Sequence, residues 1–192
     1  EEYMNPSAIE RLDHVVNLAE KLDIKIMLCM GEGNVRANRE FFNSDEAKTR
    51  YKNRLRYIVA RWGYSPAIGM WEFFNEIDNV QHRDRNGVIP AAEIVAWHDQ
   101  MSAYLKDIDP FDHITTTSIS HRDLEGLNSV PGLDINQKHI YNATVSIPNN
   151  IRSYSDKFGK PYIIGEFGYE WDWSKNFDDF ADGMNMDFSR GL

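Results

Sequence analysis

The sequence predicts an α/β fold with a parallel sheet, of the closed (β/α)8 barrel type. Five short apolar or β-branched segments alternate with segments of helical periodicity. The long polar loops follow strands, as in a barrel whose chemistry lies at the C-terminal ends of its strands. The doubly wound open sheet is the alternative, but residues 30–34 lack the third glycine and the directly following helix of its phosphate loop.

Start and stop signals define the expected helices. One helix begins after Asn5, and a second begins at Ser44, whose hydroxyl can cap the first turn. A third starts at Pro90, because proline is tolerated in the first turn of a helix. Gly63 and Gly159 end two helices, since glycine is the preferred residue just beyond a helix.

The elements in between are expected to be buried parallel strands. The first strand contains the single cysteine, Cys29, which we expect to be a buried and unreactive thiol. In chain order the prediction is a helix after residues 5–7, a strand at 24–30, a polar loop at 31–44, a helix from 44 to 62, a strand ending at 76, a loop at 77–89, a helix from 90 to 108, strands at 113–118 and 134–141, a helix at 151–158, a strand ending at 166 and a final helix around 177–188.

The bulk composition limits the function. The 192 residues, 42% of them apolar, suit one domain over residues 1–192. A net charge of −9 argues against a nucleic-acid partner, which would need a basic surface, and no apolar run reaches the roughly 18 residues of a membrane span. The first residues carry no signal-peptide pattern. Because a complete barrel takes about 250 residues, we expect the central piece of a longer domain, with a self-sufficient five-stranded domain as the alternative.

Two of the expected strands end in a glutamate. Glu76 closes the apolar run that begins at residue 68, and Glu166 closes the run that begins at residue 161. Hydrolysis of a glycosidic bond needs two such groups: an acid that protonates the leaving oxygen, and a carboxylate that attacks or stabilises the sugar. If neighbouring strand ends hold both carboxylates, this pattern predicts a glycosidase. The alternative for Glu76 is a surface glutamate that opens a loop.

Strand alternation gives three further expectations. It sends Asn75 to the face opposite Glu76, so both can enter one site only if the strand end is distorted, which we predict. It places His139 and Tyr141 on one face, where a tyrosine hydroxyl can hydrogen-bond Glu166. It also turns Glu72 toward the barrel interior, where we expect it to pair with a basic side chain.

These motifs resemble a known family. Residues 71–76 (WEFFNE) resemble the fourth-strand motif of clan A glycoside hydrolases, and residues 164–168 (IGEFG) resemble their seventh-strand nucleophile motif. Residues 139–141 (HIY) lie between them and are similar to the His-x-Tyr on the sixth strand of glycoside hydrolase family 5, which includes cellulases and mannanases. The resemblance covers nearly the whole chain and implies a partial (β/α)8 barrel of about strands three to seven.

The resemblance also implies an activity: retaining hydrolysis of β-linked poly- or oligosaccharides without a cofactor. Glu76 would be the acid/base, Glu166 the nucleophile, and Asn75 the ligand of the hydroxyl beside the reacting carbon. His139 and Tyr141 would support the nucleophile. By the same resemblance the protein would be secreted or periplasmic, whereas its oligomeric state is not predicted.

Three other residues are candidates for lining sugar subsites. Trp171 and Trp173 follow the last expected strand, where their indole faces suit stacking against sugar rings or packing within the protein. His121, in the loop after residues 113–118, would line a subsite or serve only the structure.

No metal site is predicted. The loop at residues 78–87 has oxygen ligands and a glycine but lacks the closing glutamate of a calcium loop, which indicates a solvated rim. The alternative function, from another class, is a barrel that binds carbohydrate without turnover or a scaffold module of a larger polysaccharide-processing protein. A Schiff-base barrel enzyme is disfavoured, because alternation turns Lys138 away from His139 and Tyr141.

Overall fold

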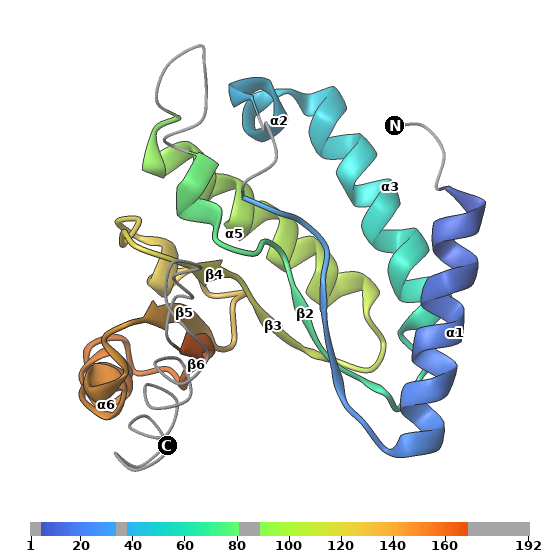
Figure 1. Ribbon diagram of the computed structural model, residues 1–192. Helices are drawn as coiled ribbons and strands as arrows, with labels where there is room; N and C mark the ends of the chain where they lie inside the picture. The colour runs from blue at the N-terminus through green and yellow to red at the C-terminus, as the bar shows by residue number, and fades with distance from the viewer. Residues whose placement is uncertain (1–4, 34–37, 81–88, 169–192) are drawn as a thin grey trace, which may run out of the picture.

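A computed structural model describes residues 5–33, 38–80 and 89–168, and Figure 1 shows their arrangement. Helices and parallel strands alternate along the described chain. In order they are α1 (Pro6–Leu22), β1 (Ile26–Cys29), α2 (Arg39–Asn43), α3 (Asp45–Trp62), β2 (Ile68–Glu72), η1 (Ile77–Asn79), α5 (Ala91–Ile108), β3 (Ile114–Thr116), β4 (Ser118–Ile119), η2 (Leu127–Ser129), β5 (Asn136–Tyr141), η3 (Thr144–Ser146), α6 (Ile147–Phe158) and β6 (Tyr162–Gly168).

The predicted starts of α1, α3 and α5 are confirmed to within a residue, whereas α6 begins at Ile147 rather than at the expected residue 151. The side chain of Asn5 accepts a hydrogen bond from the Ser7 amide at 3.0 Å, and Ser44 Oγ accepts one from the Ala47 amide at 3.3 Å. These bonds satisfy amides that the first turn of a helix leaves without partners. At its other end α6 stops at Gly159, whose φ of 63° lies in the left-handed region.

All five predicted strands form, and every pairing between them is parallel. The strand expected at residues 113–118 is split in two. Its first half, β3, pairs with β2, and its second half, β4, pairs with β5. This one run therefore joins the two three-stranded sheets into the series β1-β2-β3/β4-β5-β6, in which every neighbour is reached by a crossover, as in (β/α) units.

The strand series curves inward. Gln137 Nε2 on β5 donates to Glu72 Oε1 on β2 at 2.8 Å, although the β3/β4 run lies between these strands. Side chains on non-neighbouring strands meet in this way only across a concave face. That face is buried and polar, with Glu72, Thr116, Ser118 and Gln137 all below 5% exposure. The curvature is that of part of a barrel wall.

The apolar core lies between the convex side of β1–β3 and the helices α3 and α5 (Figure 1). Trp97 of α5 is its centre, in ring contact with residues from three other segments: α2, α3 and the segment after β2. One of those segments is α2, which lies inside the region expected to be a polar loop. Asn38 caps α2 and Phe42 is 1% exposed, so a single buried ring anchors a helix too short to give a periodic signal.

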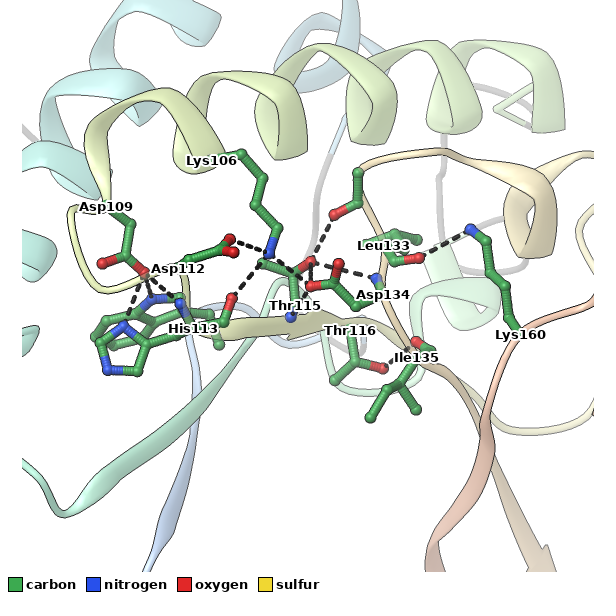
Figure 2. Close-up of polar contacts among 12 residues, drawn as sticks. Lys106, Asp109, Asp112, His113, Thr115, Thr116, Leu133, Asp134, Ile135 and Lys160 are labelled. Atoms are coloured by element: carbon green, nitrogen blue, oxygen red, sulfur yellow. Dashed lines mark hydrogen bonds and ion pairs between the residues drawn. The ribbon is translucent and has the colours of Figure 1, made fainter.

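A polar network ties the starts of the strands to the end of α5 (Figure 2). Lys106 Nζ lies 2.7 Å from Asp134 Oδ2, and the same oxygen accepts from the Thr115 amide at 2.8 Å. Asp109 Oδ2 accepts from Trp71 Nε1 at 2.9 Å. These contacts lie at the end of the strands opposite the two strand-end glutamates, the face that serves stability in barrel proteins.

Two expectations about burial are wrong. Cys29 is exposed rather than buried, because its side chain lies at the C-terminal end of β1. Partial desolvation and the neighbouring Glu72 nevertheless raise the pKa of its thiol to about 12, which disfavours the reactive thiolate. Asp78, assigned to a solvated rim, is fully buried.

Part of the predicted C-terminal region, including the final helix around residues 177–188, lies outside the described residues. Among the helices that the structure describes, none combines the length and the apolar character needed to cross a bilayer.

Candidate active site

Glu76 follows β2 across a distorted strand end. β2 stops at Glu72, and Glu76 itself has φ 52° and ψ 53°, a left-handed conformation that a non-glycine residue rarely adopts. The Glu76 amide donates to Ser118 Oγ at 2.9 Å, which anchors this conformation to β4. The predicted distortion is therefore present, and backbone strain of this kind often accompanies function.

Glu166 reaches the site through a bulge in β6. Lys138 on β5 pairs with Ile164, but His139 pairs with Glu166, so Gly165 is the extra residue. A Cβ atom at Gly165 would lie 2.6 Å from Gln137 Nε2, which explains the glycine. Because of the bulge, Glu166 rather than Gly165 is beside His139.

His139 joins the two carboxylates. Its Nδ1 lies 3.0 Å from Glu76 Oε1 and 3.7 Å from Glu166 Oε2, and its side chain is 2% exposed. One oxygen of each glutamate and a ring nitrogen of His139 all lie within 4.8 Å of one another. Two acids that are 90 residues apart in the chain thus meet at the carboxyl ends of β2 and β6.

The two carboxylates have different surroundings. The Glu76 side chain is 17% exposed and that of Glu166 is 47% exposed. Glu76 Oε2 accepts from Asn79 Nδ2 at 2.9 Å, whereas Glu166 Oε2 accepts from the Tyr141 hydroxyl at 2.6 Å. The hydrogen bond to Glu166, together with desolvation, raises the pKa of Tyr141 to about 12, so this hydroxyl keeps its proton and remains a donor.

Asn75 lies beside Glu76 in the chain, but its side chain hydrogen-bonds to a different segment from that of Glu76. Its Nδ2 donates to Glu32 Oε2 at 3.0 Å, in the segment after β1. The two residues also form an isolated parallel bridge. Asn75 therefore turns toward β1, while Glu76 turns toward His139 on β5.

His121 lies in the loop after β4, where Asp78 holds the backbone. Asp78 accepts from the amides of Ser120, His121 and Arg122 at 2.7, 3.0 and 3.1 Å. Burial alone would raise the pKa of Asp78, but these bonds outweigh it and lower the pKa below its ordinary value. The His121 ring is exposed and its Nδ1 lies 2.7 Å from Ser120 Oγ, so the described contacts do not join it to the glutamate pair.

The other candidate residues are placed as follows. Trp171 and Trp173 lie outside the described residues. Glu72 points into the barrel interior as predicted, where its side chain hydrogen-bonds to the amide of Gln137 and the hydroxyl of Ser118, and the basic side chain that interacts with it electrostatically is His139. Burial raises the pKa of Glu72.

The polar residues around this site that were not among the sequence candidates include Glu32, Asp78, Asn79 and Ser118. Glu32 lies between Gly31 and Gly33 directly after a strand, a pattern that could have indicated close backbone approach. Asp78 is two residues after Glu76, and nothing in the neighbouring sequence indicates that its side chain is buried.

Glu76, His139 and Glu166 are also the group of described residues whose donor atoms are close enough to hold a metal ion. Each is already engaged in hydrogen bonds within the site. Chemically, the arrangement offers two carboxylates facing one gap, a buried imidazole between them and a hydroxyl donor on one of them.

Comparison with known proteins gives a consistent result. The family model described as Cellulase (glycosyl hydrolase family 5) matches residues 1–186. A mannan endo-1,4-beta-mannosidase A from Podospora anserina is 25% identical over 87% of this chain and 52% of its own length. The chain spans about half the length of the curated relatives that it matches.

Solved structures share the fold. Cel5A from Thermotoga maritima, determined in complex with mannotriose, gives a TM-score of 0.58 at 18% identity, covering 87% of this chain and 64% of its own. A beta-glucuronidase from Bacteroides uniformis gives 0.68 at 17% identity, covering 94% of this chain and 23% of its own. These neighbours are barrel glycosidases, and the family match extends over almost all of the chain. The chain therefore belongs to glycosyl hydrolase family 5.

Proposed function

We propose that this protein is a retaining glycoside hydrolase that cleaves β-linked poly- or oligosaccharides, with Glu76 as acid/base and Glu166 as nucleophile. The observation that carries the proposal is the closeness of the two glutamates, which have oxygens within 4.8 Å of each other. Retaining glycosidases hold their carboxyl groups about 5–5.5 Å apart, whereas inverting enzymes need about 6.5–9.5 Å to admit a water molecule. Oxygens this close favour the retaining arrangement.

In the first step, Glu166 attacks the reacting carbon of the sugar while Glu76 donates its proton to the leaving oxygen. The bond between that carbon and the leaving oxygen breaks, and an ester forms between the sugar and Glu166. Glu76 suits the role of the acid because it is the less exposed carboxyl and lies near the negative charge of Glu166.

In the second step, Glu76 removes a proton from water, and the resulting hydroxide attacks the same carbon and releases Glu166. Esterification of Glu166 has by then removed its negative charge, so Glu76 is free to ionise and act as the base. Two inversions at one carbon give net retention of configuration.

Two neighbours support this cycle. The Tyr141 hydroxyl, which donates to Glu166 Oε2, stabilises the carboxylate before attack and again as the ester breaks. His139 Nδ1 lies within hydrogen-bonding distance of Glu76 Oε1 and fixes the acid beside the nucleophile. Asn75 would bind the hydroxyl beside the reacting carbon, and Trp171 and Trp173 would stack against sugar rings.

The relatives suggest the substrate. Curated relatives are mannan endo-1,4-beta-mannosidases, and a structural neighbour binds mannotriose, so a β-1,4-linked mannan is the first polymer to test. The described strands would correspond to about strands three to seven of the barrel. A polymeric substrate cannot cross a membrane, which favours an enzyme that acts in the periplasm or outside the cell.

The test compares two variants of the full-length protein. Glu166→Gln should abolish hydrolysis of every β-glycoside while leaving sugar binding intact. Glu76→Gln should lose polymer hydrolysis but retain the first step on a dinitrophenyl glycoside, whose leaving group needs no protonation. Added azide should restore turnover to this variant and give a β-glycosyl azide, because azide needs no general base.

The control is Glu46→Gln, which removes a carboxylate from the exposed surface of α3 and should leave activity unchanged. Wild-type protein that binds mannan oligosaccharides but hydrolyses none of a broad panel of β-glycosides would instead establish a binding barrel. Product of inverted configuration would contradict the assignment of Glu166 as nucleophile.

A further inference from the structure

The segment after β1 continues the pairing with β2 beyond both strand ends. The Asn75 amide donates to the Gly31 carbonyl at 2.9 Å, and the Gly33 amide donates to the Asn75 carbonyl at 2.7 Å. Glu32 and Asn75 are therefore bridge partners in an isolated parallel pair. This pair lies one residue before Glu76, at the mouth of the candidate site.

The backbones pack so closely at this bridge that neither Gly31 nor Gly33 could carry a side chain. A Cβ atom at Gly31 would lie 2.6 Å from the Phe73 carbonyl oxygen, and one at Gly33 would lie 2.0 Å from the Glu76 carbonyl oxygen. Neither distance is compatible with a side chain. The two glycines thus allow the backbone around Glu32 to press against the backbone of the proposed acid/base.

The side chain of Glu32 then determines how Asn75 is oriented. Asn75 Nδ2 donates to Glu32 Oε2 at 3.0 Å, and both residues are partly buried. An ionised carboxylate can only accept hydrogen bonds, so the amide nitrogen must face Glu32 and the amide oxygen must face away from it. Without Glu32, this hydrogen bond no longer fixes which way the terminal amide of Asn75 faces.

We propose that Glu32 is a positioning residue that fixes the Asn75 amide, so that Asn75 Oδ1 accepts a hydrogen bond from the sugar hydroxyl beside the reacting carbon. This inference rests on the proposed function and adds a specificity element to it. The effect of Glu32 on catalysis passes through Asn75 and requires a substrate that carries this hydroxyl. Its effect should therefore disappear when either the amide or the hydroxyl is removed.

The first experiment measures kcat and KM of the full-length protein on an aryl β-glycoside and on its 2-deoxy analogue. Glu32→Ala should lower kcat/KM on the parent glycoside about tenfold, since it releases a charge-assisted hydrogen bond, and should leave the analogue nearly unaffected. Glu32→Gln, whose amide oxygen can still accept, should recover part of the loss. The matched control, Glu46→Ala, removes an exposed carboxylate on α3 and should change neither substrate.

A double-mutant cycle separates positioning from general stability. In an Asn75→Ala background, Glu32→Ala should cause no further loss on the parent glycoside, because the group that it orients is gone. Equal losses on both substrates, or losses that multiply in the double variant, would overturn the inference, since both indicate that Glu32 serves only the fold.

An NMR measurement that requires no catalysis tests this inference independently of the proposed function. In NMR spectra, the Asn75 side-chain amide, assigned from the signal missing in Asn75→Ala, should have one proton that is protected from exchange. That protection should vanish in Glu32→Ala. If the wild type hydrolyses no glycoside, the proposed function fails. An Asn75 signal that is identical in wild type and Glu32→Ala overturns the positioning role whether or not there is turnover.

Discussion

At the scale of single residues, the two carboxyl groups of the candidate site differ in their hydrogen-bond partners. Glu76 is held by His139 and Asn79 in a partly buried position, whereas the more exposed Glu166 has a hydroxyl donor in Tyr141. Two identical side chains thus have different surroundings, the usual way in which one site obtains both an acid and a nucleophile.

Tyr141→Phe tests this difference. The variant removes the hydroxyl that donates to Glu166 at 2.6 Å and keeps the ring. Hydrogen bonds to charged groups contribute about 1.5–3 kcal/mol, and the half-exposed position favours the lower value, so kcat should fall roughly tenfold. Steady-state kinetics on an aryl β-glycoside provides the measurement.

Tyr64→Phe is the matched control, because Tyr64 is 67% exposed and lies just before β2, at the end of the strands opposite the glutamate pair. Its kcat should equal that of the wild type. A Tyr141→Phe enzyme with unchanged kcat would show that the contact with Glu166 does not contribute to catalysis.

At the scale of elements, helix starts and strand positions could be predicted because their signals are local. Asn5 and Ser44 cap helices through residues two or three positions away. The bulge at Gly165 and the bridge between Glu32 and Asn75 could not be predicted, because each depends on the register of strands that are distant in sequence. Local alternation correctly placed His139 and Tyr141 together.

The packing of α5 against the sheet predicts a pH dependence of stability. His98 is fully buried, and its Nδ1 donates to the Ile94 carbonyl at 2.8 Å. Burial lowers the pKa of His98 to about 4, whereas an unfolded histidine has a pKa of about 6.5. Between these values the unfolded chain binds more protons than the folded one, so stability falls as the pH drops from about 6.5 to about 4.

The difference of roughly 2.5 pKa units corresponds to about 3 kcal/mol of unfolding free energy. His98→Asn keeps an N–H near the Ile94 carbonyl but cannot gain a charge. It should lower stability at pH 7 through the cavity that it leaves, yet flatten the pH dependence between 6.5 and 4. Urea unfolding at several pH values measures both effects.

The control is His14→Asn on the exposed surface of α1, which should keep the wild-type pH dependence. If His98→Asn and the wild type lose stability equally between pH 6.5 and 4, the titration of His98 is not responsible.

At the scale of the whole molecule, the curvature of the strand series brings the two acids together. Neighbouring parallel strands align their carboxyl ends, and the hydrogen bond between Glu72 and Gln137 spans the concave face below the site. The sequence predicted the fold class and the meeting of Glu76 and Glu166, because strand-end glutamates in parallel strands share one edge. It did not reveal the partner of Asn75, because only the folded chain brings Glu32 to it.

The proposed mechanism requires a covalent intermediate on Glu166. In a 2-deoxy-2-fluoro β-glycoside, the fluorine slows both the formation and the hydrolysis of the glycosyl-enzyme. A dinitrophenolate leaving group speeds up the formation step only, so the glycosyl-enzyme accumulates. Incubation of the full-length protein with this reagent, followed by proteolysis and mass spectrometry, should find one added fluorosugar on the peptide that contains Glu166. A label on any other residue, or steady hydrolysis of the parent glycoside without a label, would contradict the account.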